Sequence, residues 1–165
     1  MASVAGKLSF AEFERTYGQS DRSYEFWDGE ALPKGMPTWI HGLLQSILCQ
    51  LLRQAGYKAG SEVELRIDPR YCPKPDVIAT KGKLEVPYPT QAVEVAIEIL
   101  SPDDSMVHIL EKCRLYTAWG FPYVYVVDVD ARLVYRHINE ALEPADMLVT
   151  VPAWQIWTAL DQDLS

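Results

Sequence analysis

The clearest hydrophobic pattern in the chain runs from Val93 to Leu100. One set of alternating positions is wholly apolar and consists of Val93, Val95, Ile97 and Ile99. This two-residue period is typical of a β-strand, in which successive side chains point to opposite faces. The other face carries Ala96 and Leu100 as well as Glu98, so both faces are expected to be largely buried. The pattern predicts a central strand with an acidic side chain near its C-terminal end.

A helix is predicted directly after this strand. The segment 101–104 interrupts the alternation and supplies candidate N-cap and first-turn residues. Apolar residues then recur at helical spacing as far as Tyr116, and Gly120 is a typical helix end. A helix rises by about 1.5 Å per residue, so one that folds back along its strand would bring Lys112 level with Glu98.

The N-terminal part of the chain shows three further patterns. Ser9 and Glu12 have the spacing of a capping box, which predicts a short helix over 10–17. Residues 24–32 have the form of two short strands joined by a tight turn. A broad apolar stripe predicts a helix over 38–54.

The remaining apolar segments predict a sheet. Strands are expected at 62–68, from 76 to 79, at 123–128 and at 133–138, with an edge strand at 147–151. The tail from Trp154 fits either a helix or a loop. Because the strands at 93 and 123 flank a helix, we expect them to form a parallel crossover. The whole pattern predicts a mixed α/β fold, with a central mixed β-sheet flanked by helices.

Length and composition place this pattern in one domain. The chain has 165 residues, and no stretch approaches the roughly 20 apolar residues that cross a membrane. We expect a single domain over 1–165, with an N-terminal helix and turn at 1–23, a core at 24–140 and a C-terminal extension at 141–165. The N-terminus lacks a signal pattern, which predicts a cytoplasmic protein. The three cysteines are widely spaced, so buried free thiols are expected.

The net charge of −8 argues against a generic nucleic-acid coat protein. The charge is unevenly distributed, because basic residues outnumber acidic ones between residues 53 and 83. A local basic surface beside an acidic centre is therefore compatible with the composition.

Three residues carry candidate chemistry, although each also has an ordinary explanation. Asp76, after Pro75, fits a turn, and Lys112 on a helix fits a solvated charge. Glu98 in an apolar strand needs a partner, and a salt bridge with Lys112 alone would satisfy it. Together, two carboxylates from neighbouring strands are a hard oxygen site for Mg²⁺, and a nearby ammonium would stabilise charge on a reacting phosphate.

At this point the sequence resembles the PD-(D/E)XK nuclease superfamily, in its bacterial Uma-two type branch of restriction endonuclease-like proteins. Pro75-Asp76 resembles the PD motif, and residues 98–102 resemble the branch signature E-V-L-S-P. The wider superfamily has its lysine two residues after the acid, where this chain has Leu100. The branch places a lysine on the following helix, and Lys112 matches that spacing.

The resemblance extends over about residues 24–135. Residues 24–30 are similar to the branch's hairpin Y-E-L-x-D-G-E, and His41 matches its helix-start histidine. Lys112 begins the pattern K-x-x-x-Y-x-x-x-G. One departure is His108, which stands where the branch usually has an acid four residues before the lysine. The hydrogen-bond partners of Lys112 are therefore left open.

The resemblance implies a restriction-endonuclease-like core and a Mg²⁺- or Mn²⁺-dependent endonuclease that hydrolyses DNA. Asp76 and Glu98 would bind the metal, and Lys112 would position the attacking water. Glu30 and His41 are weaker candidates at the rim or behind the ligands. DNA is the expected partner, and a homodimer is expected because cutting both strands favours two-fold symmetry. The alternative is a catalytically inactive binding module for nucleic acid or protein that keeps the fold.

The proposed metal pair also leads to an expectation about the metal-free protein. If Asp76 and Glu98 face each other, repulsion between like charges should raise the pKa of at least one of them. Removal of one carboxylate, as in Asp76→Asn, would then leave the protein equally stable or more stable.

Overall fold

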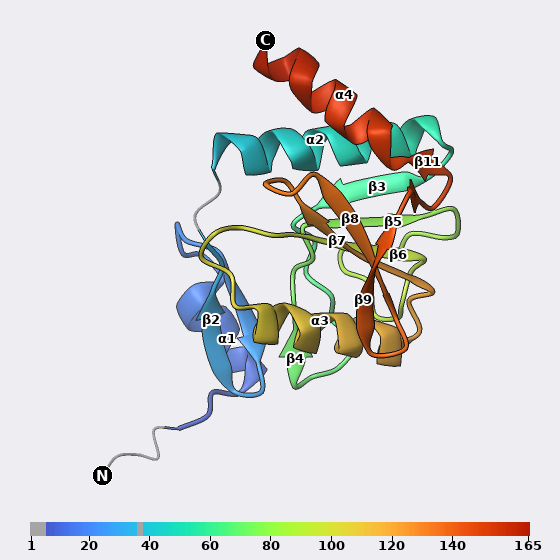
Figure 1. Cartoon of the computed structure of the whole chain (residues 1–165). Coiled ribbons are helices and arrows are strands. Elements are labelled where there is room, and N and C mark those ends of the chain that lie inside the picture. Colours follow the sequence, from blue (N-terminus) through green and yellow to red (C-terminus); the bar gives the residue numbers. More distant parts are fainter. Residues whose placement is uncertain (1–5, 36–37) are drawn as a thin grey trace.

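The computed structural model describes residues 6–35 and 38–165. Within these residues, six strands form the central sheet, in the order β3-β5-β6-β7-β8-β9 (Figure 1). Their bounds are β3 (Lys58–Ser61), β5 (Val77–Thr80), β6 (Val95–Ile99), β7 (Tyr123–Asp128), β8 (Leu133–Ile138) and β9 (Ala141–Ala145). The β6–β7 pair is parallel and the other neighbours are antiparallel, which confirms the mixed sheet and the parallel pairing across the helix.

Helices cover both faces of this sheet (Figure 1). On one face lie α2 (Trp39–Gln54) and α4 (Ala153–Leu164), and on the other lies α3 (Met106–Trp119). The alternation along β6 divides its side chains between the two layers. Ile97 and its odd-numbered neighbours pack with α2 and α4, whereas Ala96 packs with α3. Glu98 shares the face of Ala96, so it points toward α3.

A smaller unit packs beside the main sheet. It contains α1 (Phe10–Tyr17) and a three-stranded sheet of β2 (Glu30–Pro33), β1 (Tyr24–Trp27) and β4 (Tyr71–Cys72), in that order. The predicted capping box is present at the start of α1. Phe26 packs with Phe13 and Cys72 in a third hydrophobic cluster. Its neighbour Glu25 points to the opposite face of β1 and is buried against α3.

The predicted strand at 62–68 is wrong. The sheet strand in this region is the preceding β3, and Glu62 ends it with a left-handed backbone, φ +57°. The apolar alternation after Glu62 is nevertheless used in packing, since Leu65 is fully buried on the α3 side of the sheet. Its N–H donates to the carbonyl of Pro73 at 2.9 Å. The alternating pattern of residues 62–68 thus arises from burial against the α3 layer and not from pairing in the sheet. Glu64 is buried and pairs with Arg66 at 2.8 Å.

The C-terminal region also differs from the prediction. β9 was not predicted, and the edge strand expected at 147–151 is a short hairpin of β10 (Met147–Leu148) and β11 (Val151–Pro152). The tail is helical, as α4. The helix α3 begins later than the candidate caps at 101–104, because Ser105 is its N-cap. The three cysteines are free and buried, as expected.

Both outer strands of the main sheet have one backbone group that an added strand cannot use. At one edge, β9 contains Pro144, which has no N–H to donate. At the other edge, a guanidinium nitrogen of Arg53 donates to the carbonyl of Ala59 in β3 at 2.7 Å. No helix within residues 6–35 and 38–165 is long and apolar enough to cross a bilayer.

Gly120 ends α3 with a left-handed backbone, φ +105°, and its N–H binds carbonyls of the last turn. We expect Gly120→Ala to lower the free energy of unfolding by about 1–2 kcal/mol, because a Cβ is strained at this φ. An added Cβ would meet only Ala92, at an ordinary 3.8 Å, so the cost is conformational. The matched control is Gly42→Ala inside α2, which has open space around it and should gain up to about 1 kcal/mol. Urea unfolding measures both, and equal effects of the two substitutions would contradict this account.

Candidate active site

A cavity of about 500 Å³ lies where the hairpin β1–β2, the start of α2 and the layer of α3 meet the end of β6. Its wall carries ionisable side chains of both signs: Glu25, Lys34, His41, Glu62, Asp76, Glu98 and Lys112. Three of its carboxylates, those of Glu25, Asp76 and Glu98, are almost completely buried. Buried carboxylates are stable in a fold only when cations or hydrogen-bond donors meet them.

Glu98 and Lys112 form the innermost ion pair of the cavity. The Lys112 Nζ lies 2.8 Å from Glu98 Oε1 and 2.9 Å from a carboxylate oxygen of Glu25. The Tyr116 hydroxyl, one turn further along α3, donates to the same Glu98 oxygen at 2.6 Å. The prediction that α3 brings Lys112 beside Glu98 is therefore confirmed. The branch usually has an acid four residues before this lysine, where this chain has His108. Here Glu25 supplies the additional carboxylate partner of Lys112.

Asp76 directly precedes β5, where Val77 pairs with Ile97. One step further along this antiparallel register, Asp76 stands opposite Glu98. Asp76 Oδ2 accepts a hydrogen bond of 2.6 Å from the backbone N–H of Ile99, which ties the carboxylate to the end of β6. Its other oxygen, Oδ1, lies 3.0 Å from Lys34 Nζ and 3.3 Å from His41 Nε2.

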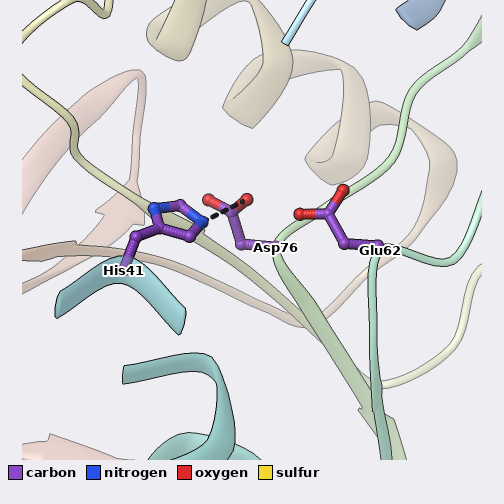
Figure 2. Close-up of side chains that lie close together, drawn as sticks. All are labelled: His41, Glu62 and Asp76. Atoms are coloured by element: carbon purple, nitrogen blue, oxygen red, sulfur yellow. Dashed lines mark ion pairs between the residues drawn. The ribbon is translucent and has the colours of Figure 1, made fainter. Parts of the chain in front are cut away.

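Figure 2 shows His41, Glu62 and Asp76 directed toward one another. Each offers one ligand atom, and these atoms all lie within 4.8 Å of one another. Glu62 is held in place by Gln45, whose side-chain amide donates to Glu62 at 2.9 Å and to the backbone carbonyl of Asp76 at 3.2 Å.

The two predicted metal ligands have opposite pKa shifts. Burial alone would raise the pKa of Asp76, but the hydrogen bond from His41 and the charge of Lys34 outweigh it and hold this pKa well below its ordinary value. Burial raises the pKa of Glu98 to about 7, with Lys112 opposing the rise and Asp76 adding to it. The pKa of one carboxylate of the pair is thus raised, as expected, although burial contributes more to this rise than repulsion between the two charges does.

Lys112 is protonated in this setting. Burial would lower the pKa of its ammonium, but the charges of Glu25 and Glu98 outweigh this and raise the pKa above its ordinary value. An ammonium has three N–H donors. The Nζ lies within 3.0 Å of three carboxylate oxygens, two of Glu25 and one of Glu98, so its donors are engaged by these two partners.

The structure brings four of the five sequence-predicted residues to this cavity: Asp76, Glu98, Lys112 and His41. It does not bring Glu30, which is exposed at the start of β2 and outside the cavity lining. His108 also lines the cavity, and its ring packs edge-on against Trp27 at a centroid distance of 4.8 Å.

Sequence reasoning missed Glu25, Lys34 and Glu62. Glu25 carried the same signal as Glu98, an acid inside a short apolar strand, and lay in the hairpin motif already noted. Lys34 and Glu62 follow the ends of strands β2 and β3, and no periodicity marks them. Their roles depend on which loops meet in space.

The donor set fits a divalent cation. Carboxylate oxygens suit Mg²⁺ and Mn²⁺, whereas an imidazole nitrogen is more typical of a zinc, copper, iron or nickel site. Asp76 and Glu98 are the predicted ligands, and Glu62 and His41 add donors beside Asp76.

A mixed sheet between helices, with carboxylates at the adjoining ends of two neighbouring strands and a lysine from the next helix, defines a restriction-endonuclease-like fold. A sequence model of the Uma2 family, described as "Putative restriction endonuclease", matches residues 10–157. The chain belongs to this family, which confirms the resemblance seen in its motifs. Restriction-endonuclease-like proteins generally use a divalent metal ion.

The fold has a solved counterpart. The chain is similar to the crystal structure of a "putative nuclease belonging to DUF820" from Anabaena variabilis, with a TM-score of 0.76 and 20% sequence identity. The match covers 93% of this chain and 99% of that one. The structure of a DrdV–DNA complex matches with a TM-score of 0.41 and 18% identity, over 71% of this chain and 10% of that one. No curated protein matches the chain.

Proposed function

We propose that the protein is a Mg²⁺- or Mn²⁺-dependent endonuclease that hydrolyses phosphodiester bonds of DNA. The observation that supports this most directly is the convergence of Asp76, Glu98 and Lys112 in one cavity, from three separate segments of the chain. In this proposal Asp76 and Glu98 hold the metal, and Lys112 positions the attacking water. Family membership supports a nuclease.

The chemistry follows from the state of each side chain. A bound divalent ion would polarise a phosphate oxygen and lower the pKa of the attacking water. Lys112, whose raised pKa keeps it protonated, acts as a donor and a positive charge and does not accept the proton from water. Its positive charge would help to orient the water and to stabilise negative charge on the phosphate. Tyr116 and Glu25 fix the positions of Glu98 and Lys112.

DNA as the substrate, a homodimer and a cytoplasmic location stay predictions from the sequence, as do the single domain and its boundaries. The net charge of −8 adds a condition to DNA binding. Affinity should rest on few phosphate contacts, so it should decrease only shallowly with salt concentration.

Cleavage of supercoiled plasmid DNA is expected to require Mg²⁺ or Mn²⁺ and to stop when EDTA is added. Glu98→Gln should remove activity, because it deletes a metal-binding charge but keeps an oxygen that accepts from Tyr116. The matched control is Glu30→Gln, which removes the same charge outside the cavity and should retain wild-type activity. Gel assays measure both. If Glu98→Gln cleaves as fast as wild type with every divalent metal, the endonuclease proposal fails.

One observation favours the alternative of a catalytically inactive binding module. Asp76 and Glu98 each already have an internal ammonium partner, Lys34 and Lys112. A fold that has lost its metal would have its carboxylates paired in this way. This module would bind DNA, RNA or protein without cleavage, and its binding would not change with EDTA.

A further inference from the structure

Lys34 lies in a site formed by oxygen atoms. Its Nζ is 2.9 and 3.1 Å from the two carboxylate oxygens of Glu62, 2.8 Å from the backbone carbonyl of Lys74 and 3.0 Å from Asp76 Oδ1. The side chain is only 12% exposed. Carboxylate and carbonyl oxygens converging on one point are the environment of a hard cation. Here the cation is the ammonium at the end of a side chain.

The oxygen Asp76 Oδ1 is shared by Lys34 and by the metal in the proposed function. An ammonium and a divalent ion on one buried carboxylate oxygen repel each other strongly, since little solvent screens them. We infer that Lys34 is a tethered cation that competes with the divalent metal for Asp76 and must leave before the metal binds. This inference rests on the proposed metal site.

The surroundings allow this exchange without a change of fold. The backbone N–H of Lys34 is fixed to the carbonyl of Ser23 at 2.9 Å, so only its side chain needs to move. Gln45 holds Glu62 and the Asp76 backbone independently of Lys34, so the oxygen site persists when the ammonium leaves. The released ammonium stays at the wall of the 500 Å³ cavity, where a substrate phosphate would supply its new partner.

The competition also couples binding of the metal to binding of the substrate phosphate. A phosphate that attracts Lys34 frees Asp76 for the metal, and a metal on Asp76 frees Lys34 for the phosphate. By linkage the two binding events then strengthen each other by the same factor. The protein without substrate keeps its carboxylates neutralised and binds metal weakly.

The first test measures Mn²⁺ binding by calorimetry without DNA. Lys34→Met, which keeps the length of the side chain but removes the charge, should bind Mn²⁺ roughly tenfold more tightly than wild type. The control is Arg22→Met, which removes a positive charge from the exposed rim of the same cavity and should change affinity much less. Equal affinity of Lys34→Met and wild type overturns the inference. So does an equal gain in both variants, because a general charge effect then explains it.

The second test uses the wild-type protein and holds even if Lys34→Met does not fold. Lysine acetylation is followed by mass spectrometry with and without Mn²⁺. Acetylation of Lys34 should rise about fivefold or more with Mn²⁺ as the ammonium is released. Exposed Lys83 should react equally in both conditions. Unchanged protection of Lys34 in saturating Mn²⁺ overturns the inference.

These measurements separate the inference from the proposed function. DNA cleavage that needs Asp76, together with an unchanged Mn²⁺ affinity in Lys34→Met, overturns the role of Lys34 alone. The reverse result, tighter metal binding without cleavage of any DNA, supports Lys34 and overturns the endonuclease proposal.

Discussion

Replacing Lys112 with methionine is expected to lower the free energy of unfolding by about 3–5 kcal/mol at pH 8 in metal-free buffer. The ammonium is 3% exposed and meets both Glu25 and Glu98, so its removal leaves two buried carboxylates without their shared cation. Urea unfolding measures the loss. The same change should reduce DNA cleavage by roughly 100-fold or more, because the charge near the reacting phosphate is gone.

These two effects of Lys112 are separable. In the double variant with Glu25→Gln, one of the two unpaired charges is removed, so most of the lost stability should return. Cleavage should stay lost, because Glu25→Gln does not restore the positive charge. Glu25→Gln alone is the control. A Lys112→Met protein as stable as wild type would contradict the buried ion pairs, and recovery of cleavage in the double variant would contradict a chemical role for Lys112.

Asp76→Asn is expected to lower the free energy of unfolding by about 2–4 kcal/mol at pH 7 without metal. This replaces the sequence-based expectation of equal or higher stability. Asp76 accepts from the Ile99 N–H and meets Lys34 and His41, so an amide nitrogen would have to face one of these donors. Glu98→Gln is the matched comparison. It should not destabilise, because burial disfavours the charge that it removes.

The pH dependence of unfolding distinguishes these two carboxylates. The pKa of Asp76 lies below its ordinary 3.8, so its stabilisation is present above that pH and is lost as the pH falls through the lower, folded-state value. Because Asp76 also raises the pKa of His41, the deficit of Asp76→Asn should increase as the pH falls from neutral and His41 gains its proton, and it should shrink only in acid.

Glu98 shows the opposite dependence. Its pKa is raised from 4.5 to about 7, so the folded wild type binds more protons than the unfolded chain between these values and loses stability as the pH rises. As the pH rises across this window, the free energy of unfolding of Glu98→Gln should increase relative to that of wild type by up to about 3 kcal/mol. Thermal melts of the three proteins from pH 4 to 8 measure both curves. Parallel curves for Glu98→Gln and wild type would contradict the raised pKa.

Two of the predicted residues of this site, Glu98 and Lys112, lie on one continuous segment. The alternation of β6 identifies Glu98, the spacing of α3 identifies Lys112, and the rise of a helix along its strand brings the two level. These are properties of local periodicity. Asp76 was predicted from a motif and from its place at the start of a predicted strand.

The missed part of the site consists of contacts between distant segments. Lys34 meets Asp76 across 42 positions, and Lys112 meets Glu25 across 87. Such contacts depend on how the hairpin docks against α3 and leave no repeating pattern. The wrong strand at 62–68 has a related origin. Its alternating side chains pack against the α3 layer, and alternation alone does not distinguish sheet pairing from such packing.

The modified edges of the main sheet limit how two copies of this chain can associate. A continuous sheet across a dimer requires an outer strand with free backbone donors and acceptors. Pro144 removes one donor from β9, and the Arg53 guanidinium occupies the Ala59 carbonyl of β3. Extension of the sheet from copy to copy, the first step toward fibrous aggregates, is therefore discouraged at both ends. A symmetric dimer of this protein is therefore disfavoured at these two edges, and a dimer formed through another surface would set the directions in which the two cavities face.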